Sequence, residues 1–328
     1  MATMNISSLT ARRAAIGVDV GGTKIAAAVV DASGRLTHRV QRATDVSGVD
    51  ATLASIRAAI EAVLADAGPT AGDVGGVGLG IPGKVDPVSG VGLLSVNLGW
   101  RDAPVVATLE AALGLPCRIE NDVSVGALGE ARYGAGRDRQ SLVYLSLGTG
   151  VAARVVIDGR LYRGAGGMAG EIGHLVSDPD SLLCKCGARG CLEAIASGPG
   201  IAARAQQAVD ARTPTALRDM AAGGPVTTRM VFAAADAGDE VAQTIVERTG
   251  QYLGGAVKTL IMLYDPEIVV LGGGLAQAGN RLTAAIIREV DRLAAESYVF
   301  RDLWRPDRLA VSVLGPDVAL LGAAALAL

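Results

Sequence analysis

A short motif that recurs in both halves of the chain constrains the fold more than any other feature. Residues 14–31 read AAIGVDV-GGTK-IAAAVVD, and residues 141–157 read SLVYLSL-GTG-VAARVVI. A Gly-Arg-Leu triplet follows each, at 34–36 and at 159–161. Apolar stretches of strand length around a glycine turn are typical of β-hairpins. Their recurrence predicts a duplicated domain whose halves each open with such a hairpin, the alternative being a chance similarity.

The segments between and after the hairpins alternate between helical and strand patterns. Helices are predicted over 51–66, within 200–263, after residue 280 and over 318–328, and strands over 75–83, 115–120, 267–273 and 309–314. This alternation predicts an α/β architecture. The polar, glycine-bearing stretch 89–101 is predicted to be a functional loop.

Length and charge narrow the class of protein. A chain of 328 residues is long enough for two domains, and 50% hydrophobic with 19% charged residues is the composition of a globular protein. The net charge of -3 gives no reason to expect a nucleic-acid or membrane partner. The apolar run 318–328 is shorter than the ~20 residues that cross a bilayer, and the N-terminal region lacks a signal-peptide pattern, so we expect a cytoplasmic protein.

Two glycine motifs resemble nucleotide-binding fingerprints but do not match them. In GVDVGGTK the final residues are Thr-Lys, whereas a P-loop ends in Lys followed by Ser or Thr. GLGIPG at 78–83 contains a proline and leads into a turn cluster instead of a helix, which argues against a dinucleotide site. A tight hairpin can still present backbone N–H groups to phosphate, with Asp19 and Lys24 available for metal and phosphate. A plain structural hairpin is the other interpretation.

The tetrapeptide IEND at 119–122 places Asn121 and Asp122 directly after a short apolar strand. Such pairs are often turn formers. The functional alternative makes Asp122 a general base and Asn121 a residue that orients a substrate hydroxyl.

Three of the four cysteines lie in CKCGARGCLE, residues 184–193. The spacing is too tight for ordinary disulfides and differs from the Cys-x-x-Cys of redox pairs. Three cysteine thiolates and one histidine imidazole suit a tetrahedral structural zinc site. The predicted ligands are Cys184, Cys186, Cys191 and His174. A buried cluster of reduced thiols is the alternative. Cys117 is predicted to be a small core residue.

Taken together, DVGGTK, GIPG, END, LGTG, RGAGGMAGEIGH, CKCGARGCLE and VVLGGG resemble, in this order, the ROK family of bacterial sugar kinases and repressors. The resemblance covers the chain from about residue 14 to its end. It implies an actin-like (ribonuclease H-like) fold of two duplicated α/β domains with a central cleft. The expected domains are 14–122, completed by 315–328, and 123–314, which carries the zinc loop.

The resemblance also implies roles for individual residues. Asp122 matches the catalytic base. The residues that match sugar contacts are Asn97, Asn121, Asp122, Glu171, His174 and Glu193. Those assigned to ATP are Asp19, Gly21, Gly22, Thr23, Lys24, Thr149, Gly150, Gly273 and Gly274, with Asp19 near Mg²⁺. The structural zinc ligands are His174, Cys184, Cys186 and Cys191.

The implied activity is transfer of the ATP γ-phosphate to the 6-hydroxyl of a hexose, with glucose favoured, in a homodimer or homotetramer. N-acetylmannosamine, kanosamine, fructose and mannose are alternative substrates, and a sugar-responsive repressor is the non-enzyme alternative. The chain departs from the family pattern at Ala152-Ala153-Arg154, where glycines usually follow LGTG, and at VSVGALGE after END. Arg154 lies in an otherwise apolar strand and must reach solvent or a partner.

Overall fold

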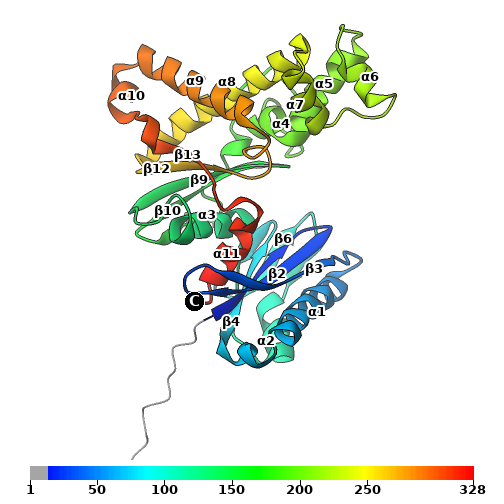
Figure 1. The fold of residues 1–328 in the computed structure, drawn as a ribbon, viewed down its shortest axis with the longest axis vertical. Helices are drawn as coiled ribbons and strands as arrows, with labels where there is room; N and C mark the ends of the chain where they lie inside the picture. The colour runs from blue at the N-terminus through cyan, green and yellow to red at the C-terminus, as the bar shows by residue number, and fades with distance from the viewer. Residues whose placement is uncertain (1–13) are drawn as a thin grey trace, which may run out of the picture. The chain divides into compact units, whose positions relative to one another are not determined.

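The computed structural model describes residues 14–328. The chain divides into two compact units. The first comprises the described residues through Tyr133 together with Asp317–Leu328, and the second comprises Gly134–Pro316. The second unit is therefore inserted into the sequence of the first (Figure 1).

A five-stranded sheet forms the centre of the first unit, in the order β3-β2-β1-β4-β8. Strands β1 to β3 are antiparallel, whereas β4 runs parallel to both β1 and β8. The strands are β1 Ala14–Val20, β2 Lys24–Asp31, β3 Leu36–Ala43, β4 Val74–Ile81 and β8 Cys117–Asn121. A small antiparallel sheet adds β5 Lys84–Asp86, β6 Val91–Ser95 and β7 Trp100–Ala103.

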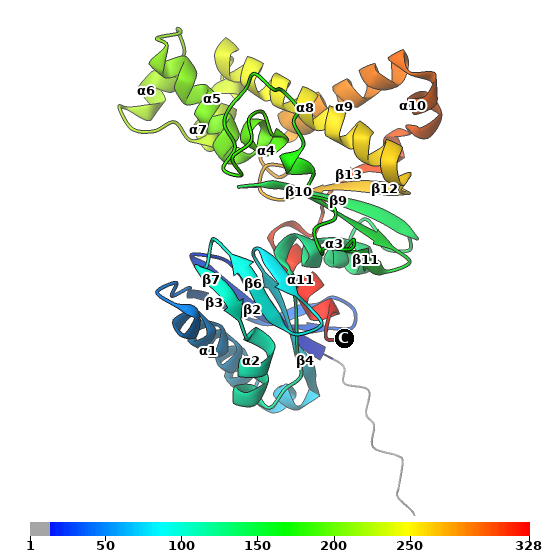
Figure 2. The same ribbon diagram turned by 180° about the vertical axis from the view of Figure 1, so that it is seen from behind.

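Helices cover both faces of this sheet. Helices α1 (Val49–Ala67) and α2 (Val105–Leu113) lie on one face, where their apolar side chains join a core with β1, β4 and β8 (Figure 2). Helices α3 (Asp122–Tyr133) and α11 (Val318–Ala325) lie on the other face, where Leu320 packs on Ala26 and Ala28 of β2. The 3₁₀ helix η1 (Gly68–Asp73) follows α1.

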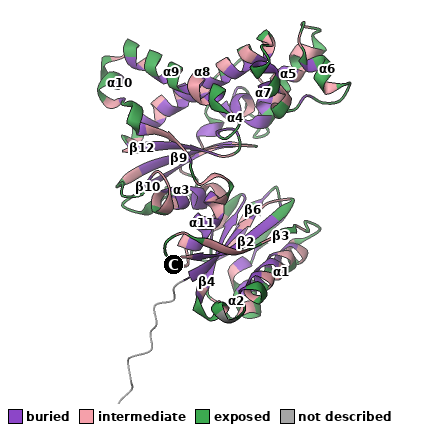
Figure 3. Cartoon of the chain, in the orientation of Figure 1, coloured by how far each residue is buried: buried purple, intermediate pink, exposed green. Residues whose placement is uncertain are grey.

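The second unit has a sheet in the order β11-β10-β9-β12-β13. Its strands are β9 Ser141–Leu147, β10 Val151–Ile157, β11 Arg160–Tyr162, β12 Ile268–Gly272 and β13 Leu309–Val311. Helices cover the face of β9 and β10 that carries Val143, Leu145 and Val155 (Figure 3). They are α4 Leu192–Ala196, α5 Gly198–Asp210, α6 Leu217–Ala221, α7 Thr228–Asp236, α8 Glu240–Tyr264, α9 Asn280–Glu296 and α10 Tyr298–Leu303, with 3₁₀ helices η2 Ile172–His174, η3 Pro306–Arg308 and η4 Gly315–Asp317.

The two sheets share one topology, which confirms the predicted duplication and α/β class. In each, the first strand pairs antiparallel with the second and parallel with the fourth, and the fifth strand lies beyond the fourth. Both predicted hairpins are present, with Val20 opposite Ile25 and Leu147 opposite Val151.

Two expectations from the sequence differ from the structure. Residues 89–101 are not one loop, because β6 and the start of β7 occupy most of them; Asn97 lies in the turn between these strands. The expected boundary at residue 122 falls at the start of α3, but this helix packs against α11 and belongs to the first unit. The unit ends at Tyr133 and resumes at Asp317 instead of 315.

Among the described residues, no helix combines the length and the apolar character that a bilayer crossing requires.

Candidate active site

The carboxyl ends of the parallel strands bring the candidate residues of the first unit to one edge of the sheet. Asp19 of β1 lies opposite Gly80 of β4, and Ile81 of β4 lies opposite Asn121 of β8. Asp19 and the Asn121-Asp122 pair therefore lie at the ends of β1 and β8, the two strands that flank β4 in the same sheet. Ligand sites in α/β folds commonly form at this edge.

Asp122 is the first residue of α3, and its carboxylate is held in a fixed orientation. Its Oδ1 accepts hydrogen bonds from the Asn121 side-chain amide, at 2.8 Å, and from the Val123 N–H, at 2.9 Å. The side-chain Oδ1 of Asn121 caps the helix by accepting from the N–H groups of Val123 and Ser124. The Asn121 amide also donates to the Gly83 carbonyl oxygen at 3.0 Å. The END motif is thus both a helix start and a means of orienting Asp122.

The hairpin turn between β1 and β2 lies beside the turn that carries Asn97. The Gly21 N–H donates to the Lys24 carbonyl oxygen at 2.9 Å, and Thr44 Oγ1 donates to the Gly21 carbonyl oxygen at 2.7 Å. A Cβ on Gly22 would lie 2.9 Å from the Asn97 carbonyl oxygen, so only glycine allows this approach. Thr23 and Lys24 of the turn are exposed.

Asp19 lies just before this turn and is half-buried. Burial raises the pKa of its carboxyl above the ordinary value, and the positive charges of Lys24 and Arg39 partly offset this effect. A nearby divalent cation would favour the ionised carboxylate, as expected of a residue near Mg²⁺.

In the second unit, two of the predicted sugar contacts are held against β10. Glu193, in the first turn of α4, accepts a hydrogen bond from the Val151 N–H through Oε2 at 3.1 Å. Glu171, just before η2, accepts from Arg154 of β10 through Oε1 at 2.7 Å. Strand β10, η2 and α4 contact one another, so the segments that carry Glu171, His174 and Glu193 lie together.

The glycines assigned to ATP in this unit also cluster. Residues Thr149 and Gly150 form the β9–β10 turn, whose Gly148 carbonyl oxygen accepts from the Gly198 N–H at the start of α5. Gly273 follows β12, and the Leu275 N–H donates to the Leu147 carbonyl oxygen at 3.0 Å. The turn after β12, which includes Gly274, therefore lies beside the end of β9. Backbone N–H groups in such turns are suited to phosphate oxygens.

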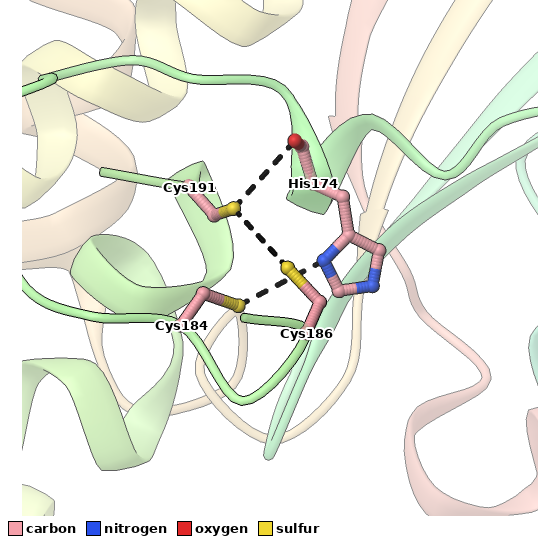
Figure 4. Close-up of side chains that lie close together, drawn as sticks. All are labelled: His174, Cys184, Cys186 and Cys191. Atoms are coloured by element: carbon pink, nitrogen blue, oxygen red, sulfur yellow. Dashed lines mark hydrogen bonds between the residues drawn. The ribbon is translucent and has the colours of Figure 1, made fainter. Parts of the chain in front are cut away.

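The predicted zinc ligands converge in the second unit (Figure 4). One ligand atom from each of His174, Cys184, Cys186 and Cys191 lies within 4.8 Å of the other three. Cys184 Sγ is 3.9 Å from His174 Nδ1, and Cys186 Sγ is 3.6 Å from Cys191 Sγ. Tetrahedral Zn²⁺ with Zn–S bonds of about 2.3 Å places its sulfurs roughly 3.8 Å apart, so the group fits zinc.

The chemistry of the thiols and of the imidazole agrees with this fit. The four cysteines all lie among the described residues and are free of disulfides. Hydrogen bonds from the Ala188 N–H and with Cys184 and Cys191 lower the pKa of the Cys186 thiol to about 7, whereas burial raises the pKa of the Cys191 thiol to about 12. Gly187 and Gly190 have φ of 95° and 75°, and these left-handed conformations bend the loop between the sulfurs. Because Nδ1 of His174 faces the sulfurs, Nε2 points to the other side of the ring (Figure 4).

Sequence reasoning identified Arg154 as unusual but did not identify its partner. The pairing with Glu171 spans 17 residues and depends on how the loop between β11 and η2 folds back along β10. No local pattern in the sequence indicates it. Cys117 is buried, as predicted, and burial raises the pKa of its thiol to about 12.

Comparisons with known proteins establish the family of the chain. The model of the ROK family matches residues 15–328. This chain belongs to the ROK family.

Proteins similar to the chain include sugar kinases of two kinds. A glucokinase from Halalkalibacterium halodurans is 35% identical over 310 residues, which cover 94% of this chain and 92% of that protein. An N-acetylmannosamine kinase from Citrobacter koseri is 35% identical over 319 residues, covering 95% and 98%. A ROK family glucokinase from Streptomyces griseus, solved in complex with glucose and AMPPNP, is 33% identical with a TM-score of 0.78, covering 95% and 98% of the two chains. The actin-like fold expected of the ROK family is confirmed by this likeness.

Proposed function

We propose that this ROK protein is an ATP-dependent hexose kinase that transfers the γ-phosphoryl group of ATP to the 6-hydroxyl of a hexose, with glucose as the leading substrate. The observation that carries the proposal is the likeness, over almost the whole chain, to a glucokinase solved with glucose and an ATP analogue. The ordered carboxylate of Asp122 supports the same chemistry.

Asp122 acts as the general base in this proposal. Phosphoryl transfer passes through a loose transition state, so the protein mainly positions the reactants and compensates charge. As the 6-oxygen of the sugar attacks the γ-phosphorus, the Asp122 carboxylate takes the hydroxyl proton and ADP leaves. The two hydrogen bonds to Oδ1 keep the carboxylate from rotating, which a positioned base requires.

The remaining proposed sugar contacts bind the other hydroxyls, and each is anchored within its own unit. Glu171 and Glu193 accept from hydroxyl groups, His174 offers Nε2, and Asn97 offers its amide. Asn121, whose amide is engaged by Asp122, Gly83 and the start of α3, contributes by orienting Asp122. Zinc, when bound, holds the loop that carries His174 in place. The turn residues Gly21, Gly22, Thr23, Thr149, Gly150, Gly273 and Gly274, with Lys24, bind the phosphates of ATP. Asp19 lies near the Mg²⁺ that accompanies the nucleotide.

We further propose that the protein acts in the cytoplasm as a homo-oligomer without a nucleic-acid partner. The net charge of -3 supports the absence of nucleic acid, since such binding depends mainly on positive charge.

A panel of sugars in a coupled assay for ADP release tests the activity. We expect turnover with glucose, and we expect Asp122→Asn to lower kcat at least ~10²-fold because the general base is lost. Isothermal titration calorimetry should find glucose binding largely retained in this variant. Asp66→Asn is the matched control, since Asp66 is an exposed carboxylate of the same unit, bonded to His38 at 2.9 Å; its kinetics should equal those of the wild type.

N-acetylmannosamine is the second candidate substrate, because a kinase for this sugar is 35% identical to the chain. The same panel separates the two, since the higher kcat/KM identifies the preferred sugar. If none of glucose, mannose, fructose, N-acetylmannosamine and kanosamine releases ADP, the proposed kinase activity is wrong.

A further inference from the structure

Arg154 is a buried cation on a strand that is otherwise apolar. It is 7% exposed and lies in β10 between Ala153 and Val155. Val151, Ala153 and Val155 face the hydrophobic core of the second unit, so Arg154 projects from the opposite face of the strand. Burial of a guanidinium is costly unless carboxylates or carbonyl groups compensate the charge. Its partners therefore indicate what the residue does.

The partners of Arg154 belong to the segment that leads into η2. Nη1 donates to the carbonyl oxygens of Ala153, at 2.8 Å, and Ala169, at 3.2 Å. Nη2 donates to Oε1 of Glu171 at 2.7 Å. The Ala153 N–H also donates to the Gly170 carbonyl oxygen at 2.8 Å, so the segment runs along the strand at this point. The planar guanidinium joins the strand, the segment and the Glu171 carboxylate at once.

The contact with Arg154 fixes the orientation of the Glu171 carboxylate and offsets its negative charge. One carboxylate oxygen is engaged by the guanidinium, and the permanent positive charge of Arg154 balances the negative charge of Glu171. Glu193 differs, because its Oε2 accepts from a neutral backbone N–H of Val151. A carboxylate whose charge is offset by a guanidinium still accepts a hydrogen bond from a neutral hydroxyl. It attracts an ammonium group much less, since the guanidinium repels that group.

We propose that Arg154 is a specificity-determining residue that acts through Glu171 and selects an uncharged hydroxyl over a protonated amino group on the sugar. The inference rests on the proposed function, in which Glu171 binds a sugar hydroxyl. It assigns the enzyme to neutral hexoses and their N-acyl derivatives and away from sugars with a free amine.

The test compares kcat/KM for glucose with kcat/KM for its 2-amino-2-deoxy and 3-amino-3-deoxy analogues, in the wild type and in Arg154 variants. The assay is run below the pKa of the sugar amines. Arg154→Met removes the charge, and we expect the ratio of amino sugar to glucose to rise about tenfold for at least one analogue. Arg154→Lys keeps the charge but not the fork of donors. We expect it to raise the KM for glucose and to leave the ratio near that of the wild type.

A double-mutant cycle tests whether the effect passes through Glu171. In a Glu171→Gln background, Arg154→Met should change the ratio little, because the charge that Arg154 balances has already been removed. Arg154→Gln serves as a second neutral variant if Arg154→Met does not fold, since Gln retains a donor for the Ala169 carbonyl group.

Arg308→Met is the matched control. Arg308 is 8% exposed, donates to the Leu303 carbonyl oxygen at 2.7 Å and pairs with Asp265 at 2.7 Å, in the same unit. Its loss should lower stability without changing the sugar ratio. The inference is overturned if Arg154→Met and Arg154→Lys lower the rates for all sugars in proportion, or if Arg308→Met shifts the ratio equally. If the wild type phosphorylates no sugar, the proposed function fails instead.

Discussion

At the scale of single residues, the carboxyl of Asp19 is held in an environment that disfavours its charge. Burial raises its pKa, and this effect exceeds the opposing effects of Lys24 and Arg39. For a carboxyl whose pKa is higher in the folded than in the unfolded state, stability is fully present below the unfolded value and falls as pH rises through the folded value. The residue therefore costs stability at neutral pH.

We expect Asp19→Asn to raise the melting temperature of the nucleotide-free protein at pH 7 and to leave it nearly unchanged at a pH below the unfolded pKa of about 3.9. The same variant should lower kcat, by about 10²-fold, if Asp19 supports the Mg²⁺ of the nucleotide. Differential scanning calorimetry across this pH range, paired with the ADP assay, checks both parts. A variant that is less stable at pH 7 and fully active would contradict the role given to Asp19.

The four cysteines are expected to differ in reactivity. Cys184, Cys186 and Cys191 should be protected by zinc and should react with a thiol reagent after a strong chelator removes the metal. Cys117 should remain unreactive in the folded chelated protein, because a pKa of about 12 leaves only ~10⁻⁴ of it as thiolate at pH 8.

Three measurements test this prediction together: metal analysis by mass spectrometry, thiol titration and the melting temperature. Chelation should release about one zinc per chain, expose three thiols and lower the melting temperature, while KM for the sugar rises because His174 is no longer held. Cys117→Ala should keep the metal. Rapid reaction of all four thiols before chelation would show that the cluster binds no metal.

At the scale of elements, helix α11 packs unusually closely on its neighbours. A Cβ added to Gly322 would overlap the carbonyl oxygen of Val125 in α3, and one added to Gly17 of β1 would overlap that of Leu320. Glycine at these positions lets the helix backbone approach both α3 and the sheet. The contact requires small residues from three elements that lie far apart in the sequence.

Two helical glycines allow a matched experiment. Gly322→Ala should lower the free energy of unfolding by at least about 2 kcal/mol, because the methyl group meets rigid backbone. Gly255→Ala in α8 should raise it by roughly 1 kcal/mol, since no atom lies within 4 Å of its added Cβ and alanine is the better helix former. Urea denaturation followed by circular dichroism measures both. If Gly322→Ala raised the free energy of unfolding instead of lowering it, α11 would not pack as described.

The elements of the first unit show which parts of the fold can be predicted from the sequence. The helix over 51–66 and the strand over 115–120 depend on local apolar periodicity, and the structure confirms them as α1 and β8. The strands β6 and β7 escaped prediction because they are only five and four residues long and are bordered by turn-forming residues such as Gly90 and Gly99. Helix α3 also escaped it, since its small residues, VSVGALGE, derive their helical stability from packing against α11.

At the scale of the whole molecule, the duplicated topology could be predicted because each copy begins with a recognisable hairpin. The zinc cluster could be predicted because its ligands lie within 18 residues of sequence, from His174 to Cys191. The Arg154–Glu171 pair could not, because its formation depends on the path of a glycine-rich segment. The point where the chain leaves the first unit could not be predicted either, since it is set by the packing of α3 on the distant α11.

The discontinuous first unit has a consequence for synthesis on the ribosome. Domains generally fold in the order in which they emerge. Here the sheet β3-β2-β1-β4-β8 is translated early, yet the helix that covers the glycines of β1 and β4 is translated after the entire second unit. One apolar face of the nascent sheet therefore lacks its covering helix α11 until residues 134–316 have been synthesised. The segment that follows the second unit in the sequence completes the unit that precedes it.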